Sequence, residues 1–310
     1  TAGSGAGNPE SSVSKVTPPT VQLADRMSAL NICCITMDDL YIVEEGIGRG
    51  AFGLVHKALW RGAEVAVKEL MLHEVMGQDR KGFEEEFCRE VVLMQRVGHH
   101  PNILKLSGVC VEPKLCLISP FCSKGSLESF LQIGRPPDKI KHRPPKVILG
   151  ILRDVAAAIV HLHQEKVIHR DIALRNVLVD ESCRGFVTDF GMSRLKAESA
   201  SYGKTESSLG PVKNMAPESI LRRKYSEASD AYMFGVLLWQ VETRERPYAQ
   251  HSGLDVVLMV NNGSQTPLSF PRWTHPKIRE VGERCLQRNP KQRPKFVEIF
   301  NQLYLLHALQ

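Results

Sequence analysis

Two short polar segments, each flanked by apolar residues, hold side chains suited to chemistry. The first contains Asp171 and, five residues later, Asn176, and the second begins at Asp189. A carboxylate can accept a proton from an attacking hydroxyl group, and Mg²⁺ prefers carboxylate and amide oxygens as ligands. The pattern predicts a general base beside a metal ion. The alternative is a pair of polar surface loops, against which the apolar flanks argue.

A glycine-rich stretch stands upstream, where Gly48, Gly50 and Gly53 precede Val55. In a dinucleotide-binding fold such a stretch opens a helix. Here strand-like sequence follows, so we expect the glycines to join two antiparallel strands and to let backbone N–H groups approach phosphate oxygens. The stretch alone is a weak signal, because glycines also mark ordinary tight turns.

Lys68 follows an apolar run, and Glu90 lies on an amphipathic segment further along the chain. If that segment is a helix packed on a sheet, the two side chains can form an ion pair, which limits the cost of desolvating the lysine. A lysine held in this way presents a fixed positive charge to phosphate oxygens. The alternative is a solvated lysine at the end of a strand.

The elements that must position these residues change type along the chain. Residues 41–70 alternate short apolar runs with glycines, which is typical of strands joined by turns. Residues 82–97 have apolar side chains at helical spacing, and residues 103–111 and 114–122 are further strand candidates. Helical patterns then cover three later segments, residues 147–163, 226–244 and 277–305. Strands followed by helices predict an α+β fold with a small β-rich lobe, a larger helical lobe and a cleft between them.

Composition limits the class of protein. The chain has 310 residues, 43% of them hydrophobic, which is enough for a large core. Its net charge is only +6 and no basic cluster alternates with aromatic residues, so nucleic acid is not an expected partner. The eight cysteines include no CxxC pair, which favours reduced core thiols and a cytosolic environment. No apolar run is long enough to suggest a membrane helix.

The motifs occur in one order: the glycine-rich stretch, the Val-Ala-Val-Lys run that ends at Lys68, the His-Arg-Asp run that ends at Asp171, Asp-Phe-Gly, and Ala-Pro-Glu at 216–218. This set resembles the signature of protein kinase catalytic domains over roughly residues 38–306. The resemblance implies that the γ-phosphoryl group of ATP, with Mg²⁺ as cofactor, is transferred to protein hydroxyl groups. It also implies these boundaries: a flexible or juxtamembrane-like leader at 1–37, a catalytic domain at 38–310, its N-lobe at about 38–119, a hinge at 119–124 and a C-lobe at about 125–310.

The resemblance implies a role for each motif. Asp171 is the expected base, and the expected catalytic set is Asp171, Lys68, Glu90 and Arg175. Asn176 and Asp189 are the expected Mg²⁺ ligands. The expected nucleotide-binding residues are Gly48, Gly50, Gly53, Val55, Ala66, Lys68, Ser119, Pro120, Cys122 and Leu178. A further ion pair, between Glu218 and Arg293, is expected to be structural.

Two segments resemble tyrosine kinases more closely than other protein kinases. Ala173 stands where serine/threonine kinases normally have a lysine, and Arg175 completes an Ala-x-Arg-Asn ending. Residues 211–213, Pro-Val-Lys, resemble a platform that supports a tyrosine side chain, although Asn214 replaces the usual tryptophan. We therefore expect tyrosine hydroxyl groups in proteins as acceptors. The alternatives are a serine/threonine or dual-specificity kinase and a catalytically inactive binding module.

Residues 192–210 are polar and rich in Ser and Gly, as in an activation loop. Its tyrosine, Tyr202, matches the position of an autophosphorylated tyrosine in many tyrosine kinases. Arg170 and Arg194 are the cations expected to receive that phosphate. Modification of Ser207 or Ser208 instead would favour dual specificity.

The cellular setting is inferred from weaker signals. A Pro- and Lys-rich stretch at 132–146 and the Ser- and Pro-rich leader slightly favour a receptor, and hence the cytoplasmic side of the plasma membrane, over a cytosolic kinase. The expected partners are proteins bearing tyrosine and a second copy of the chain for trans-autophosphorylation. Membrane attachment would lie outside these residues.

Overall fold

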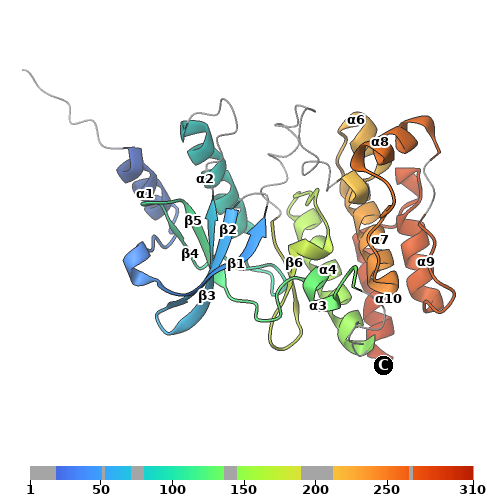
Figure 1. Cartoon of the computed structure of the whole chain (residues 1–310), viewed down its shortest axis with the longest axis horizontal. Coiled ribbons are helices and arrows are strands. Elements are labelled where there is room, and N and C mark those ends of the chain that lie inside the picture. The colour runs from blue at the N-terminus through green and yellow to red at the C-terminus, as the bar shows by residue number, and fades with distance from the viewer. Residues whose placement is uncertain are drawn as a thin grey trace, which may run out of the picture.

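The computed structural model describes residues 19–50, 53–70, 80–135, 145–189, 212–264 and 268–309. Figure 1 shows a β-rich part that holds the strands and one long helix, beside a larger part built mainly of helices. We call these parts the N-lobe and the C-lobe, and they meet after strand β5. The arrangement confirms the expected α+β fold with two lobes.

The N-lobe sheet has five antiparallel strands in the order β1-β2-β3-β5-β4. The strands are β1 Tyr41–Gly50, β2 Gly53–Trp60, β3 Ala63–Leu70, β4 Gly108–Cys110 and β5 Cys116–Pro120. β1 and β2 form a hairpin that places Gly50 opposite Gly53. The glycine-rich stretch therefore joins two antiparallel strands, as its sequence predicts.

Helix α2, Arg80–Val97, is the long helix of the N-lobe. Phe87, Val91, Met94 and Val97 are buried at the helical spacing that the sequence shows. Glu90 is buried with them and is only 5% exposed. The face of α2 that packs inward therefore carries one carboxyl group among apolar side chains.

Residues 19–37 are folded, which corrects the expected boundary of the flexible leader. Helix α1, Pro19–Ala29, buries Leu23 and Met27 in the same apolar cluster as part of α2. Figure 1 shows α1 at the outer end of the N-lobe beside β4 and β5. The polar composition of this segment conceals the helix, because only two apolar side chains, one helical turn apart, attach it to the core. Residues 1–18 lie outside the described part.

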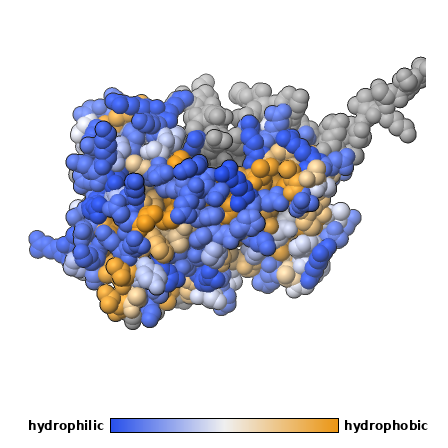
Figure 2. All heavy atoms as spheres, turned by 180° about the vertical axis from the view of Figure 1, so that it is seen from behind, coloured by the Kyte–Doolittle hydropathy of each residue, from blue (hydrophilic) through white to orange (hydrophobic). Residues whose placement is uncertain are grey.

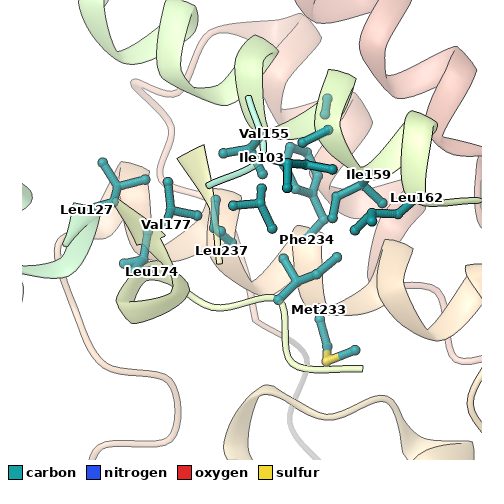
Figure 3. Close-up of a cluster of buried hydrophobic side chains, with 14 of the residues drawn as sticks. Ile103, Leu127, Val155, Ile159, Leu162, Leu174, Val177, Met233, Phe234 and Leu237 are labelled. Carbon is teal, nitrogen blue, oxygen red and sulfur yellow. The ribbon is translucent and has the colours of Figure 1, made fainter. Parts of the chain in front are cut away.

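The C-lobe is built around α7, which is buried over most of its length. Figure 3 shows side chains of α4 and α7 in one buried cluster with Leu174 and Val177, which follow Asp171 in the chain. The helices are α3 Leu127–Leu131, α4 Pro145–Gln164, α6 Pro217–Arg222, α7 Glu227–Thr243, α8 Gly253–Asn262, α9 Pro276–Cys285 and α10 Phe296–Ala308. Strands β6 Val177–Val179 and β7 Gly185–Val187 form a hairpin, and short 3-10 turns occupy η1 Met37–Asp39, η3 Leu174–Asn176 and η5 Pro290–Gln292.

The helical pattern at 277–305 forms two helices instead of one. α9 ends at Cys285, and Pro290 and Pro294 precede the start of α10. Proline lacks the N–H that a helix interior requires, so the pattern is interrupted there.

The surface contains few large apolar areas in the view of Figure 2, where hydrophilic residues cover most of the face and hydrophobic ones form separate patches. No helix within the described ranges is long and apolar enough to cross a membrane. All eight cysteines lie in the described part, and their thiols are free.

Candidate active site

The loop that carries Asp171 is held from below by a buried carboxylate on α7. Asp230, 0% exposed, accepts hydrogen bonds from the backbone N–H of His169 at 2.9 Å and of Arg170 at 3.0 Å. His163 of α4 contacts the same carboxylate at 2.8 Å. Two backbone hydrogen bonds to one buried helix therefore hold the loop in place at the two residues before Asp171.

Asp171 is buried and held by two neighbours. Arg175 Nη2 lies 2.5 Å from Asp171 Oδ1, and Asn176 Nδ2 donates to Asp171 Oδ2 at 2.8 Å. Asn176 Nδ2 also donates to the Asp171 carbonyl oxygen at 2.8 Å. Because the amide nitrogen of Asn176 points to Asp171, its amide oxygen is directed elsewhere, where a metal ion can bind it. The structure brings Asp171, Arg175 and Asn176 together in one contact group.

His169 links this loop to the segment that carries Asp189. The backbone N–H of Asp171 donates to His169 Nδ1 at 3.2 Å, so Nδ1 is an acceptor. Nε2 then carries the proton and donates to the Thr188 carbonyl oxygen at 3.2 Å. Burial lowers the pKa of His169, which favours this neutral form. The two carboxylates are therefore positioned by one neutral imidazole.

Lys68 forms its ion pair with Asp189, which corrects the expected pairing with Glu90. Burial lowers the pKa of Lys68, but the charges of Asp189 and Glu90 outweigh burial and leave this pKa above its ordinary value. Lys68 is therefore charged. Asp189 follows β7 and can reach Lys68 across the cleft between the lobes, and the ammonium group takes that carboxylate as its closest partner.

Glu90 lies in the same cavity as this pair, and one of its own carboxyl oxygens accepts no hydrogen bond from the described residues. Glu90 Oε2 is buried and has no hydrogen-bond partner among the described residues. Burial raises the pKa of Glu90 to about 7, against the opposing effect of Lys68. Glu90, Lys68 and Asp189 line one cavity with Ser119 and Thr188. The cavity wall thus contains a lysine and two carboxyl groups that compete for it.

The sheet register places two of the expected nucleotide-binding residues next to residues that line this cavity. β2 pairs Val55 with Lys68, and β3 pairs Ala66 with Ser119. Ser119 is 8% exposed and lines the cavity. After β5, Phe121 N–H donates to the Glu64 carbonyl oxygen at 3.2 Å, which ties the hinge to β3.

The remaining expected contacts lie on either side of the hinge. Pro120 is exposed at the end of β5, whereas Cys122 is buried, and burial raises the pKa of its thiol to about 11. Leu178 of β6 pairs with Phe186 and forms a bridge with Ser126, just before α3. Strand β6 of the C-lobe therefore pairs with the segment that follows the hinge.

The glycines of the β1–β2 hairpin differ in their steric requirements. Gly53 has φ +149°, and a Cβ atom there would lie 1.7 Å from the Glu69 carbonyl oxygen. At Gly48 the nearest atom to an added Cβ is Val55 Cβ at 3.7 Å, an ordinary contact. The fold therefore requires glycine at position 53, while the strand backbone would accept a side chain at position 48.

The family profile of protein tyrosine and serine/threonine kinases matches residues 41–303. This chain belongs to that family. Serine/threonine-protein kinase CTR1 of Arabidopsis thaliana is 34% identical over 84% of the chain, which covers 31% of CTR1. Serine/threonine-protein kinase STY17, also of Arabidopsis thaliana, is 32% identical over 84% of the chain and 44% of STY17. Dual specificity protein kinase shkC of Dictyostelium discoideum is 34% identical over 84% of the chain and 50% of shkC. The chain thus spans at most about half the length of these relatives.

The donor set of this kinase fits Mg²⁺ bound together with a phosphate ligand. Thr188 N–H donates to the Asn176 carbonyl oxygen at 3.0 Å, which keeps Asn176 next to Asp189. These residues offer one amide oxygen and one carboxylate, both hard ligands. No group of three or more His, Cys, Asp or Glu in the described part is arranged to hold a metal ion. Mg²⁺ commonly takes only one or two protein carboxylates and completes its shell with phosphate oxygens and water, so the two residues suffice.

The expected regulatory residues are only partly described. Tyr202 and Arg194 lie outside the described residues. Arg170 is described, and its guanidinium group lies 5.2 Å from the centre of the Tyr225 ring, a cation–π contact. The Pro-rich stretch at 132–146 is described only at its two ends.

The expected Glu218–Arg293 ion pair is present. Arg293 Nη1 lies 2.6 Å from Glu218 Oε1, and Nη2 lies 2.9 Å from Oε2, so the pair is bidentate. The side chain of Arg293 is 0% exposed. The pair connects the start of α6 to the segment before α10.

Sequence reasoning missed some residues that shape the site of this kinase. Leu104 and Leu117 line the cavity, and Met27 of α1 belongs to the main apolar core cluster. Leu104 and Leu117 are ordinary apolar strand residues in the sequence, so no local signal distinguishes them. Met27 could be found from its helical spacing with Leu23.

Proposed function

We propose that this kinase uses ATP and Mg²⁺ to phosphorylate tyrosine hydroxyl groups as well as serine or threonine hydroxyl groups of proteins. The observation that carries the proposal is the contact of Arg175 with Asp171 beside a buried Ala173. The cation of the catalytic loop stands four residues after the base, as in tyrosine kinases. The relatives, in contrast, carry serine/threonine or dual-specificity names.

The site residues divide the work as follows. Asp171 accepts the proton of the attacking hydroxyl group, while Arg175 and Asn176 hold its carboxylate in place. Lys68 provides positive charge for phosphate oxygens, and the hinge backbone at Pro120 and Cys122 binds adenine. When bound to Asn176 and Asp189, Mg²⁺ neutralises charge on the phosphates. Gly48, Gly50 and Gly53 lie in the hairpin over this cleft.

The choice of hydroxyl group depends on the reach from the peptide backbone to Asp171. A tyrosine hydroxyl group lies further from its own backbone than a serine hydroxyl group does. The platform that supports the peptide must therefore lie further from Asp171 for tyrosine than for serine. Val212 is buried against α8, and Lys213 Nζ donates to the Tyr248 carbonyl oxygen at 3.1 Å. These contacts fix the described end of the proposed platform and support acceptance of tyrosine.

The proposal is tested with three peptides of one sequence that differ only in carrying Tyr, Ser or Thr at the acceptor position. We expect phosphorylation of the Tyr peptide and of at least one other peptide, identified by mass spectrometry. Asp171→Asn should lower turnover about 10²–10⁴-fold with nucleotide affinity retained. Phosphorylation of only one class of hydroxyl group would reject dual specificity, and no phosphorylation of any peptide would reject the kinase activity.

A second readout uses the protein as its own substrate. After incubation of the dephosphorylated chain with ATP and Mg²⁺, we expect modification of Tyr202, and the Tyr202→Phe variant should gain less activity from preincubation. Phosphate on Ser207 or Ser208 instead would support the serine/threonine half of the proposal, and the Tyr peptide then decides the tyrosine half.

A further inference from the structure

The N-terminal residues 19–36, here called the N-terminal strap, dock on the N-lobe through both their helix and their tail. In α1, Leu23 is 5% exposed and Met27 is 0% exposed, whereas Asp25, Arg26 and Ala29 are exposed. The two buried side chains join the apolar cluster that contains Phe87, Cys88 and Val91 of α2. One face of α1 is therefore buried against the lobe.

The tail of the strap connects two elements of the N-lobe. Gln95 Nε2 of α2 donates to the Leu30 carbonyl oxygen at 3.0 Å. A few residues later, Ile35 N–H donates to the Val109 carbonyl oxygen, and Val109 N–H donates to the Cys33 carbonyl oxygen, both at 2.8 Å. Val109 belongs to β4, so the tail bonds to helix α2 at one point and to the sheet edge at the next.

The tail of the strap packs closely against β4. A Cβ atom on Gly108 would lie 2.6 Å from Ile35 Cδ1 and 2.7 Å from the Cys33 carbonyl oxygen. The backbone of the strap thus approaches β4 as closely as a glycine allows. Ile35 itself is 4% exposed.

Helix α2 contacts the strap through Gln95 and contributes Glu90 to the catalytic cavity. Glu90 lines that cavity with Lys68 and Asp189, and its Oε2 has no hydrogen-bond partner among the described residues. If Asp189 binds a metal ion, its carboxylate has less negative charge to offer Lys68, and Glu90 is the other carboxyl group of the cavity that could then pair with Lys68. That exchange requires α2 to stay where it is, because a helix moves its side chains as a rigid unit.

We propose that the N-terminal strap is a positioning element for catalysis: Met27, Leu23 and the Gln95–Leu30 bond hold α2 so that Glu90 stays within reach of Lys68. The proposal rests on the phosphotransferase activity, but not on which hydroxyl group accepts the phosphate. Met27 touches no reacting atom, so its effect must pass through α2.

The test compares Met27→Asp with Ala29→Asp, which places the same charge on an exposed position of the same helix. Turnover is measured on whichever peptide the unmodified chain phosphorylates, and hydrogen exchange of residues 82–97 is followed by mass spectrometry. We expect Met27→Asp to lower kcat at least tenfold, to leave KM for the peptide within about twofold, and to raise exchange in α2. Ala29→Asp and the conservative Met27→Leu should match the unmodified chain.

A second variant covers the case in which Met27→Asp does not fold. Gln95→Ala removes only the bond to Leu30, and Arg89→Ala at an exposed position of α2 is its control. Gln95→Ala should lower kcat severalfold and raise exchange in α2, whereas Arg89→Ala should do neither. The proposal is overturned if the strap exchanges freely while α2 exchange and kcat stay unchanged, or if release of the strap raises kcat. Because exchange is measured without substrate, failure of the strap hypothesis is distinguishable from absence of kinase activity.

Discussion

At the residue scale, the site contains three ionisable side chains, whereas an ion pair needs only two. Lys68 pairs with Asp189, and Glu90 remains in the same cavity without a partner for Oε2 among the described residues. An ionised carboxylate that is buried and not hydrogen-bonded is unfavourable, so Glu90 gains by holding a proton. The protonation of Glu90 is therefore coupled to the partner that Lys68 has.

This coupling predicts how stability depends on pH. The pKa of Glu90 is raised from 4.5 to about 7. Between these values the unfolded chain has lost the proton and the folded chain still holds it, so the free energy of unfolding falls as pH rises from 4.5 through 7. The loss is at most about 3 kcal/mol. The Glu90→Gln variant lacks this titration, so its stability relative to the unmodified chain should increase between pH 5 and pH 8.

The measurement is denaturant unfolding of both proteins at pH 5, 6, 7 and 8. Glu85→Gln, at an exposed position of the same helix, is the control and should show no such trend. A constant difference between Glu90→Gln and the unmodified chain across this range would show that Glu90 does not titrate there.

At the element scale, the path of the β1–β2 hairpin depends more on Gly53 than on Gly48. Gly53 begins β2 opposite Gly50 and lies against the Glu69 carbonyl oxygen of β3. Its φ of +149° is unfavourable for a residue with a side chain. The hairpin therefore depends on position 53 for its path over the cleft.

We expect Gly53→Ala to destabilise the N-lobe and to weaken nucleotide binding, whereas Gly48→Ala leaves stability within about 0.5 kcal/mol. A sparsely populated backbone conformation of this kind costs about 1–3 kcal/mol for a residue with a Cβ atom, and the contact with Glu69 adds to it. Thermal unfolding and nucleotide titration of the two variants provide the comparison. Equal melting temperatures for the two would contradict the steric explanation.

At the scale of the whole molecule, Arg293 joins parts of the C-lobe that are far apart in the chain. Besides the bidentate pair with Glu218, Nη1 donates to the Ala228 carbonyl oxygen at 2.8 Å, and Nε donates to the Gln287 carbonyl oxygen at 2.7 Å. One buried guanidinium group thus connects α6, the start of α7 and the turn after α9. Its removal leaves Glu218 without this partner inside the lobe.

Arg293→Met should lower the free energy of unfolding by about 3–5 kcal/mol, the range for breaking a buried ion pair by removing one partner. The matched control is Arg284→Met, because Arg284 forms an exposed pair with Glu298 at 3.1 Å. Exposed pairs contribute about 0–1 kcal/mol, so the control should change little. Both values come from denaturant unfolding, and similar losses for the two variants would contradict a special role for Arg293.

The sequence by itself determined the parts of this protein that depend on local order along the chain. Short apolar runs divided by glycines located β1, β2 and β3, and helical spacing located α2, α4 and α7, because these patterns depend on neighbours within a few residues. The five-residue spacing of Asp171 and Asn176 on one loop predicted that they lie around one site, whereas the contact of Arg175 with Asp171 was not predicted. The Glu218–Arg293 pair is long-range, and it was predicted only through the resemblance.

The tertiary structure decided which distant residues meet. Lys68 has two acidic candidates, Glu90 on α2 and Asp189 after β7, and only the relative position of these elements selects Asp189 in this structure. Polar composition hid the docking of α1, because Leu23 and Met27 are buried only once α2 and the sheet edge are assembled beside them. Local preferences act between neighbours in sequence. Ion pairs and docking surfaces form between segments whose distance is set by packing of the whole core.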